Sequence, residues 1–378
     1  MESSVFVEEN KLLSAGEIMN ALEQMFRRME MIDTFCDQDF PLYSSGGNSN
    51  WSVSSGGSWM GGFWVACWWL RAKITGSAKD QQKAGKFCRK LAGKLTLDSG
   101  YRSMIFWHGA ALGNVWLHDG QARKLADTSI AALAHGFNSR LNCIPLGTAM
   151  GELVTGSYSV SIDNFASLIQ LLCSSPEKHY HHIAQRHTET LLAACQGDQG
   201  AFYAEAGFDG YKFLAKGRAG AWSRGQAWAM LGLSRAAAQW GEPYLSLTRE
   251  ACTYWRDMHK GHLPCNRLGQ AEDVKDPSAA VIASLAMLSL ARLLPDETFW
   301  CEYAHQQLST VLYSSYFTVI NADSAGHAAY QDRSSGLFSG CCYRTRQNIE
   351  EMVESVWGNF FLMATLAVLA DLIDPCDC

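Results

Sequence analysis

The chain has 378 residues, of which 48% are apolar and 18% charged, so it can bury a large core. Its formal net charge is −6, from 31 basic and 37 acidic residues without any Lys/Arg run, which argues against nucleic acid or an anionic membrane as a partner. The N-terminal segment lacks the basic and apolar parts of a signal peptide, and no apolar stretch has the length of a membrane span. The 13 cysteines, an odd number lying mostly in apolar stretches, are typical of reduced thiols. We therefore expect a cytoplasmic globular protein.

Apolar residues recur at three- and four-residue spacing through most of the chain, whereas alternation with period two is rare. Ser77 and Asp276 directly precede two of the periodic segments and are predicted N-caps. The spacing predicts helices over 15–31, 62–75, 78–95, 103–117, 120–139, 160–173, 177–195, 223–239, 243–258, 277–293, 298–312 and 348–372.

Twelve helices without evident strands suggest six helical hairpins. Closing the hairpins into a ring buries an inner set of helices behind an outer set, so the predicted fold is an all-α (α/α)6 barrel, with residues 1–378 as a single domain. An open helical-repeat solenoid is the alternative, but no fixed-period repeat supports it. The segment 44–57, rich in Gly and Ser, is predicted to be a long loop between helices.

Tryptophans crowd the region around the second predicted helix, and the chain has 13 in all. Trp64 and Trp68 lie one helical turn apart and are expected in the core. Trp59 precedes the helix in a glycine-rich loop, where its indole can stack on the C–H face of a sugar ring or simply pack against the loop.

Two charged residues open apolar helical segments. Asp163 lies near the start of the segment 160–173, where an acid ordinarily stabilises the helix N-terminus. If its side chain faces an interior lined by aromatic residues, burial raises its pKa and makes it a general acid. Arg224 lies in the string W-S-R-G-Q-A-W at 222–228 and can clamp a carboxylate with its guanidinium fork, or pack at the surface between tryptophans.

The sequence gives no support for a metal or a cofactor. His179, His181 and His182 lack a carboxylate or cysteine at metal-ligand spacing, and the C-terminal cysteines form no paired C-x-x-C arrangement. The chain also lacks the glycine-rich nucleotide-binding motifs and the G-x-S-x-G elbow of serine hydrolases. We expect no metal and no cofactor.

Taken together, five strings resemble the unsaturated glucuronyl hydrolases of glycoside hydrolase family 88: S-W-M-G-G-F-W at 58–64, S-I-D at 161–163, W-S-R-G-Q-A-W, D-P-S-A-A at 276–280 and V-W-G-N-F at 356–360. The likeness runs from about residue 57 to residue 372, and W-S-R-G-Q-A-W is its most specific part. It implies an (α/α)6 barrel that removes a 4,5-unsaturated uronic acid from the non-reducing end of lyase-generated oligosaccharides. In that chemistry an Asp protonates the C4=C5 double bond, water adds at C5, and the hemiketal opens and expels the rest of the chain.

The resemblance also implies roles for individual residues. Asp163 matches the family's general acid/base, and Arg224 matches the Arg of the W-S-R-G-Q-A-W string. Trp59 and Trp228 match aromatic positions that line the sugar site, and Trp222 begins the same string. The implied partner is an oligosaccharide that contains uronic acid.

The chain departs from the family at three places. Tyr101 stands where the family has its second essential Asp, and Asp98 lies three residues earlier. The loop before Trp222 offers Lys212 and Lys216 where family members have His and Gln, and Asn359 stands where an acid is common.

Three functions therefore stay open at the level of sequence. The first is the hydrolase, with Asp163 as general acid/base and Arg224 or a nearby Lys at the substrate carboxylate. The second is a uronate lyase on the same barrel, with Tyr101 as base and a Lys or Arg stabilising the developing charge. The third is a catalytically impaired uronide-binding protein, because loss of one of two cooperating carboxylates can abolish turnover while leaving binding intact.

Overall fold

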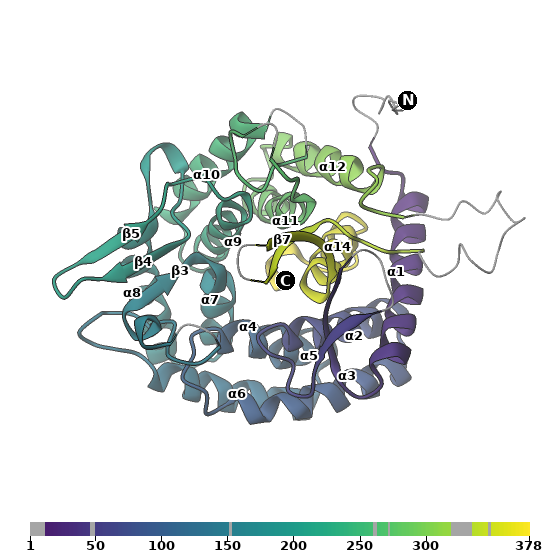
Figure 1. The fold of residues 1–378 in the computed structure, drawn as a ribbon, viewed down its shortest axis with the longest axis horizontal. Helices are drawn as coiled ribbons and strands as arrows, with labels where there is room; N and C mark the ends of the chain where they lie inside the picture. Colours follow the sequence, from purple (N-terminus) through teal and green to yellow (C-terminus); the bar gives the residue numbers. More distant parts are fainter. Residues whose placement is uncertain are drawn as a thin grey trace, which may run out of the picture.

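Several helices are buried on nearly every face. The computed structural model describes residues 12–45, 50–150, 153–259, 263–270, 273–318, 335–346 and 349–378. The buried helices are α2 (Gly61–Thr75), α9 (Ser223–Trp240), α11 (Pro277–Leu293) and α14 (Val356–Leu369). Their sequences are apolar all round, and a helix of that kind must be enclosed by others. Together with the segment 102–117 and α7 (Phe165–Cys173), they form an inner ring in which α14 packs back against α2 (Figure 1).

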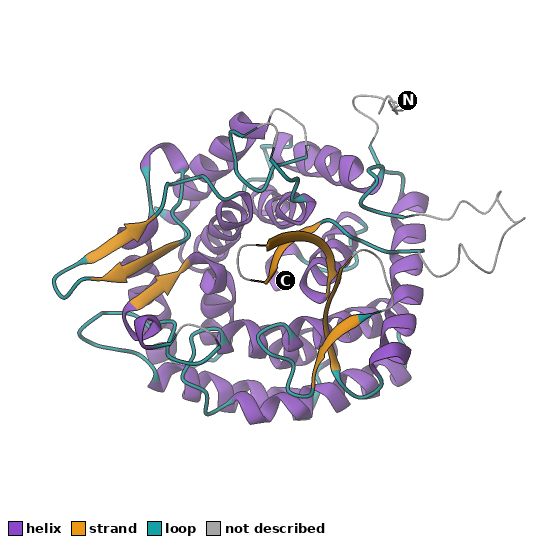
Figure 2. Cartoon of the chain, viewed as in Figure 1, coloured by secondary structure: helices purple, strands orange, loops and turns teal. Residues whose placement is uncertain are grey.

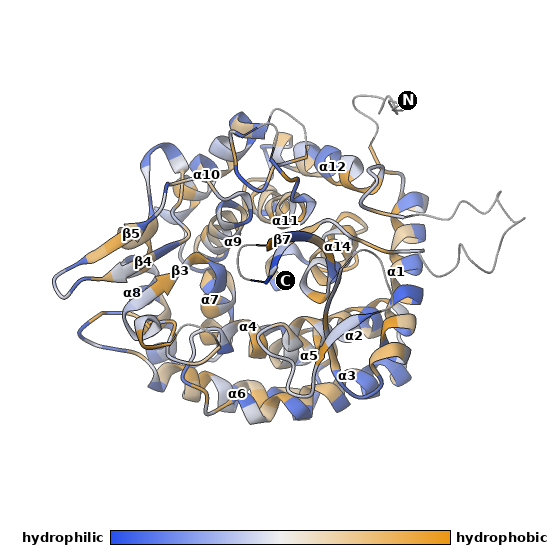
Figure 3. Ribbon diagram, in the orientation of Figure 1, coloured by the Kyte–Doolittle hydropathy of each residue, from blue (hydrophilic) through white to orange (hydrophobic). Residues whose placement is uncertain are grey.

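A second set of helices surrounds this ring. Each packs on an inner neighbour and carries a mixture of hydrophilic and hydrophobic residues (Figure 3). The outer helices are α1 (Ala15–Cys36), α3 (Ala78–Lys90), α6 (Gly120–His135), α8 (Lys178–Cys195), α10 (Tyr244–His259) and α12 (Phe299–Leu312). The closed double ring confirms the predicted (α/α)6 barrel and rules out the open solenoid. In the described part of the chain, no helix combines the length and apolar character that a membrane crossing needs.

Because outer and inner helices alternate along the chain, all inner helices run in the same direction through the barrel. The segments that enter the inner helices therefore meet at one mouth of the ring, where two strands cross the opening (Figure 2). This topology brings residues that are far apart in sequence to the same place.

Two small sheets lie among the connections, and the sequence analysis predicted neither. The first has the order β2-β1-β7-β6, and the second the order β3-β4-β5, with all neighbouring strands antiparallel. The strands are β1 (Phe40–Ser45), β2 (Trp51–Ser54), β3 (Ser159–Ser161), β4 (Glu205–Phe208), β5 (Phe213–Lys216), β6 (Cys341–Arg346) and β7 (Ile349–Ser355). The predicted loop 44–57 thus contains parts of a hairpin, while residues 46–49 lie outside the described residues.

The predicted starts of two inner helices are wrong. Residues 349–355 form β7, and α14 begins only at Val356, where the Ser355 hydroxyl caps the helix by accepting from the Gly358 N–H at 3.0 Å. Residue 348 lies outside the described residues. At the other site, β3 and a single 3-10 turn, Ile162–Asn164, precede α7. In both cases the strand leads directly into the helix or its first turn and its last residues are buried, so apolar residues on both sides of the junction conceal the change in backbone conformation.

One of the two predicted N-caps is confirmed. The Ser77 hydroxyl accepts from the Asp80 N–H at 3.2 Å at the start of α3. Asp276 precedes α11 as predicted, but it makes no capping hydrogen bond, because its carboxylate pairs with Arg224 instead.

The segment 102–117 consists of α4 (Arg102–Phe106), one π-helical turn η2 (Trp107–Ala111) and α5 (Leu112–Leu117). It crosses α2 at very short range, since a Cβ placed on Gly62 would lie 2.5 Å from the Ile105 carbonyl oxygen. Only glycine permits this approach. Within the wide turn, His108 is buried at 3% exposure among aromatic rings.

Candidate active site

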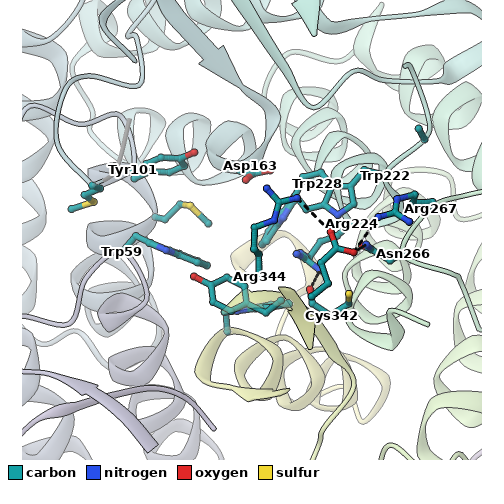
Figure 4. A pocket seen from close by; sticks show the side chains of 16 residues that line it. Trp59, Tyr101, Asp163, Trp222, Arg224, Trp228, Asn266, Arg267, Cys342 and Arg344 are labelled. Atoms are coloured by element: carbon teal, nitrogen blue, oxygen red, sulfur yellow. Dashed lines mark hydrogen bonds and ion pairs between the residues drawn. The ribbon is translucent and has the colours of Figure 1, made fainter. Parts of the chain in front are cut away.

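A pocket of about 520 Å³ opens at the barrel mouth where the inner helices begin (Figure 4). This volume falls in the range of small-molecule sites. Its lining comes from widely separated segments: Trp59, Tyr101, Met104, Met150, Asp163, Ala221, Trp222, Arg224, Trp228, Asn266, Arg267, Cys342, Tyr343, Arg344, Glu350 and Trp357. Six of the ten residues singled out from the sequence are in this set.

Asp163 reaches the pocket from the 3-10 turn before α7. Its backbone N–H donates to the Ser161 hydroxyl at 3.2 Å, and that hydroxyl donates to the Ala204 carbonyl oxygen at 3.2 Å. These bonds attach the turn to the chain just before β4. The Asp163 side chain is half-buried and lines the pocket.

Tyr101 and Asp98, the two candidates for the second acid position, lie in different places. Tyr101 lines the pocket, and its ring lies beside Asp163 in Figure 4. Asp98 is exposed and lies outside the pocket lining. Its carboxylate accepts from the Thr148 N–H at 3.0 Å and from the Thr148 hydroxyl at 2.8 Å, so it anchors the loop that follows Gly147.

Aromatic side chains form the walls of the pocket. Trp59 meets Phe63 edge-to-face at a centroid distance of 6.2 Å, and Trp228 meets Phe361 in the same way at 5.1 Å. These contacts fix the two indoles from behind and leave them as part of the lining. Rigid aromatic faces of this kind suit the C–H surface of a sugar ring.

Arg224 is held in the pocket wall by a buried partner. Its Nη1 donates to the Asp276 carboxylate and, at 2.8 Å, to the Cys342 carbonyl oxygen. Its guanidinium lies 4.8 Å from the Trp222 ring and 5.0 Å from the Trp357 ring. Burial raises the pKa of Asp276, and Arg224 opposes that shift.

Asp276 receives further hydrogen bonds. The Ser278 hydroxyl donates to its Oδ1, as does the Cys342 N–H at 3.4 Å. A buried carboxylate with this many donors is fixed in orientation and so fixes Arg224.

A cluster of polar side chains that the sequence analysis missed lies on the pocket wall opposite Tyr101. The Glu350 carboxylate accepts from Asn266 Nδ2 at 3.1 Å, Arg267 Nη2 at 3.3 Å and Arg344 Nη2 at 3.5 Å. The two arginine side chains are 50% and 67% exposed, so they are available to an anionic ligand. The sequence signal is a basic pair, Arg344 and Arg346, followed by an acidic pair, Glu350 and Glu351, which a strand hairpin would explain.

The remaining predicted residues lie outside the pocket lining. Lys216 pairs with Glu205 across β4 and β5, and the Lys212 N–H donates to the Asp209 carboxylate at 2.9 Å in the turn between these strands. Asn359 is buried and donates from Nδ2 to Glu354 Oε1 at 3.2 Å. Within the described ranges, no group of three or more His, Cys, Asp and Glu side chains is arranged to hold a metal ion.

The sequence and the fold are similar to those of known hydrolases. The unsaturated chondroitin disaccharide hydrolase of Streptococcus pyogenes serotype M1 is 22% identical over 309 residues, which cover 75% of each chain. The unsaturated glucuronyl hydrolase of Bacillus sp. GL1, described as responsible for glycosaminoglycan degradation, gives a TM-score of 0.80 at 17% identity, over 93% of this chain and 96% of that one. No protein-family model matches the sequence.

A third relative was solved with a sugar bound. It is an Asp-to-Asn mutant of the unsaturated glucuronyl hydrolase of Streptococcus agalactiae, complexed with dGlcA-GalNAc6S. Its TM-score is 0.76 at 16% identity, over 95% of this chain and 93% of that one. These similarities confirm the resemblance that the motifs predicted, and at such identities they establish a shared fold.

Proposed function

We propose that this protein is a glycoside hydrolase that removes a 4,5-unsaturated uronic acid from the non-reducing end of lyase-generated oligosaccharides. The observation that carries the proposal is the meeting in one pocket of Asp163, from the S-I-D string, with Arg224 and Trp228, from the W-S-R-G-Q-A-W string. The names of the structural relatives support a hydrolase over a lyase, and the unsaturated disaccharide bound by one of them has the substrate chemistry proposed here.

In the proposed reaction Asp163 acts first as acid and then as base. Its carboxyl donates a proton to C4 of the vinyl ether, which leaves positive charge at C5 shared with the ring oxygen. The Asp163 carboxylate then accepts a proton from a water molecule as the water oxygen bonds to C5. The resulting hemiketal opens to a C5 ketone, which makes C1 a hemiacetal, and collapse of the hemiacetal releases the remaining oligosaccharide.

The other pocket residues bind the substrate. Trp59 and Trp228 stack on the uronate ring, and Arg224 attracts its carboxylate from the pocket wall. Lys212 and Lys216 are left out of this assignment because both are exposed on or beside β5, away from the pocket lining. Asp98 and Asn359 are left out as well, because each is bonded to a protein group outside the pocket.

The test is to follow the near-ultraviolet absorbance of unsaturated disaccharides made by a polysaccharide lyase. The wild-type protein is expected to remove the absorbance, and Asp163→Asn is expected to lose about 10²–10⁴-fold in rate, as for removal of a general acid. Asp127→Asn, an exposed change on α6, is the matched control. Wild-type rates in Asp163→Asn would overturn the assignment. A rise in absorbance on saturated polyuronate would identify the protein as a lyase. Binding of the unsaturated disaccharide without turnover would identify it as a catalytically impaired binding protein.

A further inference from the structure

A small cavity lies behind Asp163, on the side away from the barrel mouth. Its lining includes Asp163, His108, Ser167, Gln170 and Cys378. The space that the centre of a water molecule can occupy is about 10 Å³. This is about the smallest space that holds one water molecule, and the lining offers the polar partners that a buried water needs.

The protonation of His108 follows from its contacts. Its Nδ1 lies 2.8 Å from the Met104 carbonyl oxygen, and because a carbonyl oxygen only accepts, Nδ1 carries the proton. The imidazole packs against Phe63, Phe360 and Phe361 at centroid distances of 4.2, 5.1 and 5.9 Å. Burial in this apolar cage lowers the pKa of His108 to about 3, so the ring is neutral and its Nε2 is a hydrogen-bond acceptor.

We propose that His108 is a positioning residue that favours the protonated form of Asp163. Its Nε2 accepts a hydrogen bond from one water molecule in the cavity, and that water accepts the hydrogen bond that the protonated Asp163 carboxyl donates. The protonated carboxyl has an O–H to donate and the carboxylate does not, so this arrangement stabilises the acid. The inference rests on the proposed function, in which Asp163 must begin each cycle protonated.

Other groups around the cavity are compatible with this chain of bonds. Gln170 donates from Nε2 to the Cys376 and Cys378 carbonyl oxygens at 3.3 and 2.6 Å, so its Oε1 can only accept. The Ser167 hydroxyl donates to the Asn164 carbonyl oxygen at 3.1 Å. The Cys378 thiol is neutral, because burial raises its pKa.

The charged and titratable groups near this chain have opposing effects. From α9, Arg235 donates to Ser289 at 2.8 Å and to the Cys378 carbonyl oxygen at 2.9 Å. Its charge lowers the pKa of His108, which keeps the imidazole neutral, but it also favours ionised Asp163. On the pocket side, Asp163 shares the lining with Tyr101, Tyr343, Glu350 and three arginines, Arg224, Arg267 and Arg344. The arginine charges favour ionised Asp163, and the Glu350 charge opposes them.

His108 supplies an effect that Tyr101 does not. A second carboxylate next to a general acid raises the pKa of that acid by charge repulsion. Tyr101 occupies the corresponding position here and is uncharged in its phenol form, so it does not repel the Asp163 carboxylate. A neutral imidazole that accepts a hydrogen bond favours the acid by another route and adds no charge to the barrel interior.

The test compares the pH dependence of kcat/KM in two variants of the full chain on an unsaturated disaccharide. His108→Phe removes the acceptor and is expected to move the alkaline limb to lower pH by about one unit, the size of one hydrogen bond. His108→Gln retains an acceptor near the Nε2 position and is expected to keep the limb near the wild-type pH. If the alkaline limb of His108→Phe stays at the wild-type pH or moves to higher pH, His108 does not favour protonated Asp163, and the proposal is overturned.

A second measurement does not depend on the folding of His108→Phe. In wild-type protein with ¹⁵N-labelled histidine, the signal lost in His108→Gln is assigned to His108. It is expected to show the neutral Nδ1–H tautomer from pH 5 to 8, and an Nε2–H tautomer or a titration in that range overturns the proposal. If wild-type protein has no activity on the unsaturated disaccharide, the proposed function itself fails, and the two failures are thereby distinguished.

Discussion

Arg28 on the first outer helix forms a buried ion pair with Glu354 on β7, 326 residues later in the chain. Arg28 Nη2 lies 2.6 Å from Glu354 Oε2, and Arg28 Nε lies 3.1 Å from Oε1. The two side chains are only 4% and 0% exposed. The pair joins α1 to the strand that leads into α14, so it connects the beginning of the ring to its end.

Removing one partner of this pair is expected to destabilise the protein strongly. Arg28→Leu leaves the Glu354 carboxylate buried, with the Asn359 amide as its one remaining hydrogen-bond donor among the described residues, and the expected loss is about 3–5 kcal/mol in the free energy of unfolding. Arg27→Leu breaks an exposed pair with Glu23 and is expected to cost at most about 1 kcal/mol. Urea unfolding at pH 7 measures both changes, and equal losses in the two variants would contradict this account.

Asp276 is expected to matter for catalysis through Arg224. Asp276→Asn removes the charge that fixes the guanidinium, and a misplacement of about 1 Å can cost about 10²-fold in rate. Arg224→Lys is expected to lose as much, because an ammonium cannot pair with Asp276 while lying flat between Trp222 and Trp357. Steady-state kinetics gives the size of both losses, with thermal unfolding as the check on folding. Wild-type kcat/KM in a folded Asp276→Asn protein would show that Arg224 needs no partner.

Protein stability is expected to fall in mild acid, because three buried histidines must gain protons on unfolding. Burial lowers the pKa values of His108, His187 and His259 to about 3, 4 and 4. An unfolded histidine has a pKa of about 6.5, so below that pH the unfolded chain binds more protons than the folded one. The stability that these groups confer is therefore complete above about pH 6.5 and is lost as the pH falls toward 4.

His187 allows this effect to be isolated. Its Nδ1 accepts from the Ile144 N–H at 3.1 Å, a bond that Asn can keep without titrating. The difference in urea midpoint between pH 7 and pH 4.5 is expected to be smaller in His187→Asn than in wild type. Asp276 and Asp377, whose pKa values burial raises, oppose the trend equally in both proteins. An identical difference in the two proteins would assign the acid sensitivity to other groups.

Restoring a carboxylate at position 101 is expected to change the pH profile of activity. In Tyr101→Asp, a negative charge in the pocket raises the pKa of Asp163, so the alkaline limb of kcat/KM moves to higher pH. Asp98→Asn is expected to leave the limb in place, because Asp98 bonds to Thr148 outside the pocket. If Asp98→Asn is the variant that shifts the alkaline limb, the loop that carries Asp98 must rearrange when substrate binds.

The sequence was sufficient to predict the barrel and one side of the pocket. Helical periodicity is a local property, and Trp59, Asp163 and Arg224 lie at the starts of predicted inner helices or just before them, so the ring topology brings them together. The sequence alone could not decide whether Asp98 or Tyr101 lines the pocket. They are three residues apart at a helix start, and only the contact with Thr148 decides which one faces away.

The opposite wall depends on contacts between distant segments. Glu350 is part of the pocket because β7 pairs with β1 and β6, and two of its partners, Asn266 and Arg267, come from a loop more than 80 residues earlier. Buried residues on both sides of the boundary between β7 and α14 concealed that boundary in the sequence, and so the position of this wall. No pattern within one segment identifies Asn266, Arg267 and Arg344 as neighbours.

The common direction of the inner helices has an electrostatic consequence. Each helix carries a partial positive charge of about half a unit at its N-terminus, where backbone N–H groups lack partners within the helix. Because α2, α7, α9, α11 and α14 all begin at the barrel mouth, the positive ends of their dipoles converge there. In a chain with a formal net charge of −6, these dipoles add positive potential at the barrel mouth, which favours the entry of the anionic sugar that we propose as substrate.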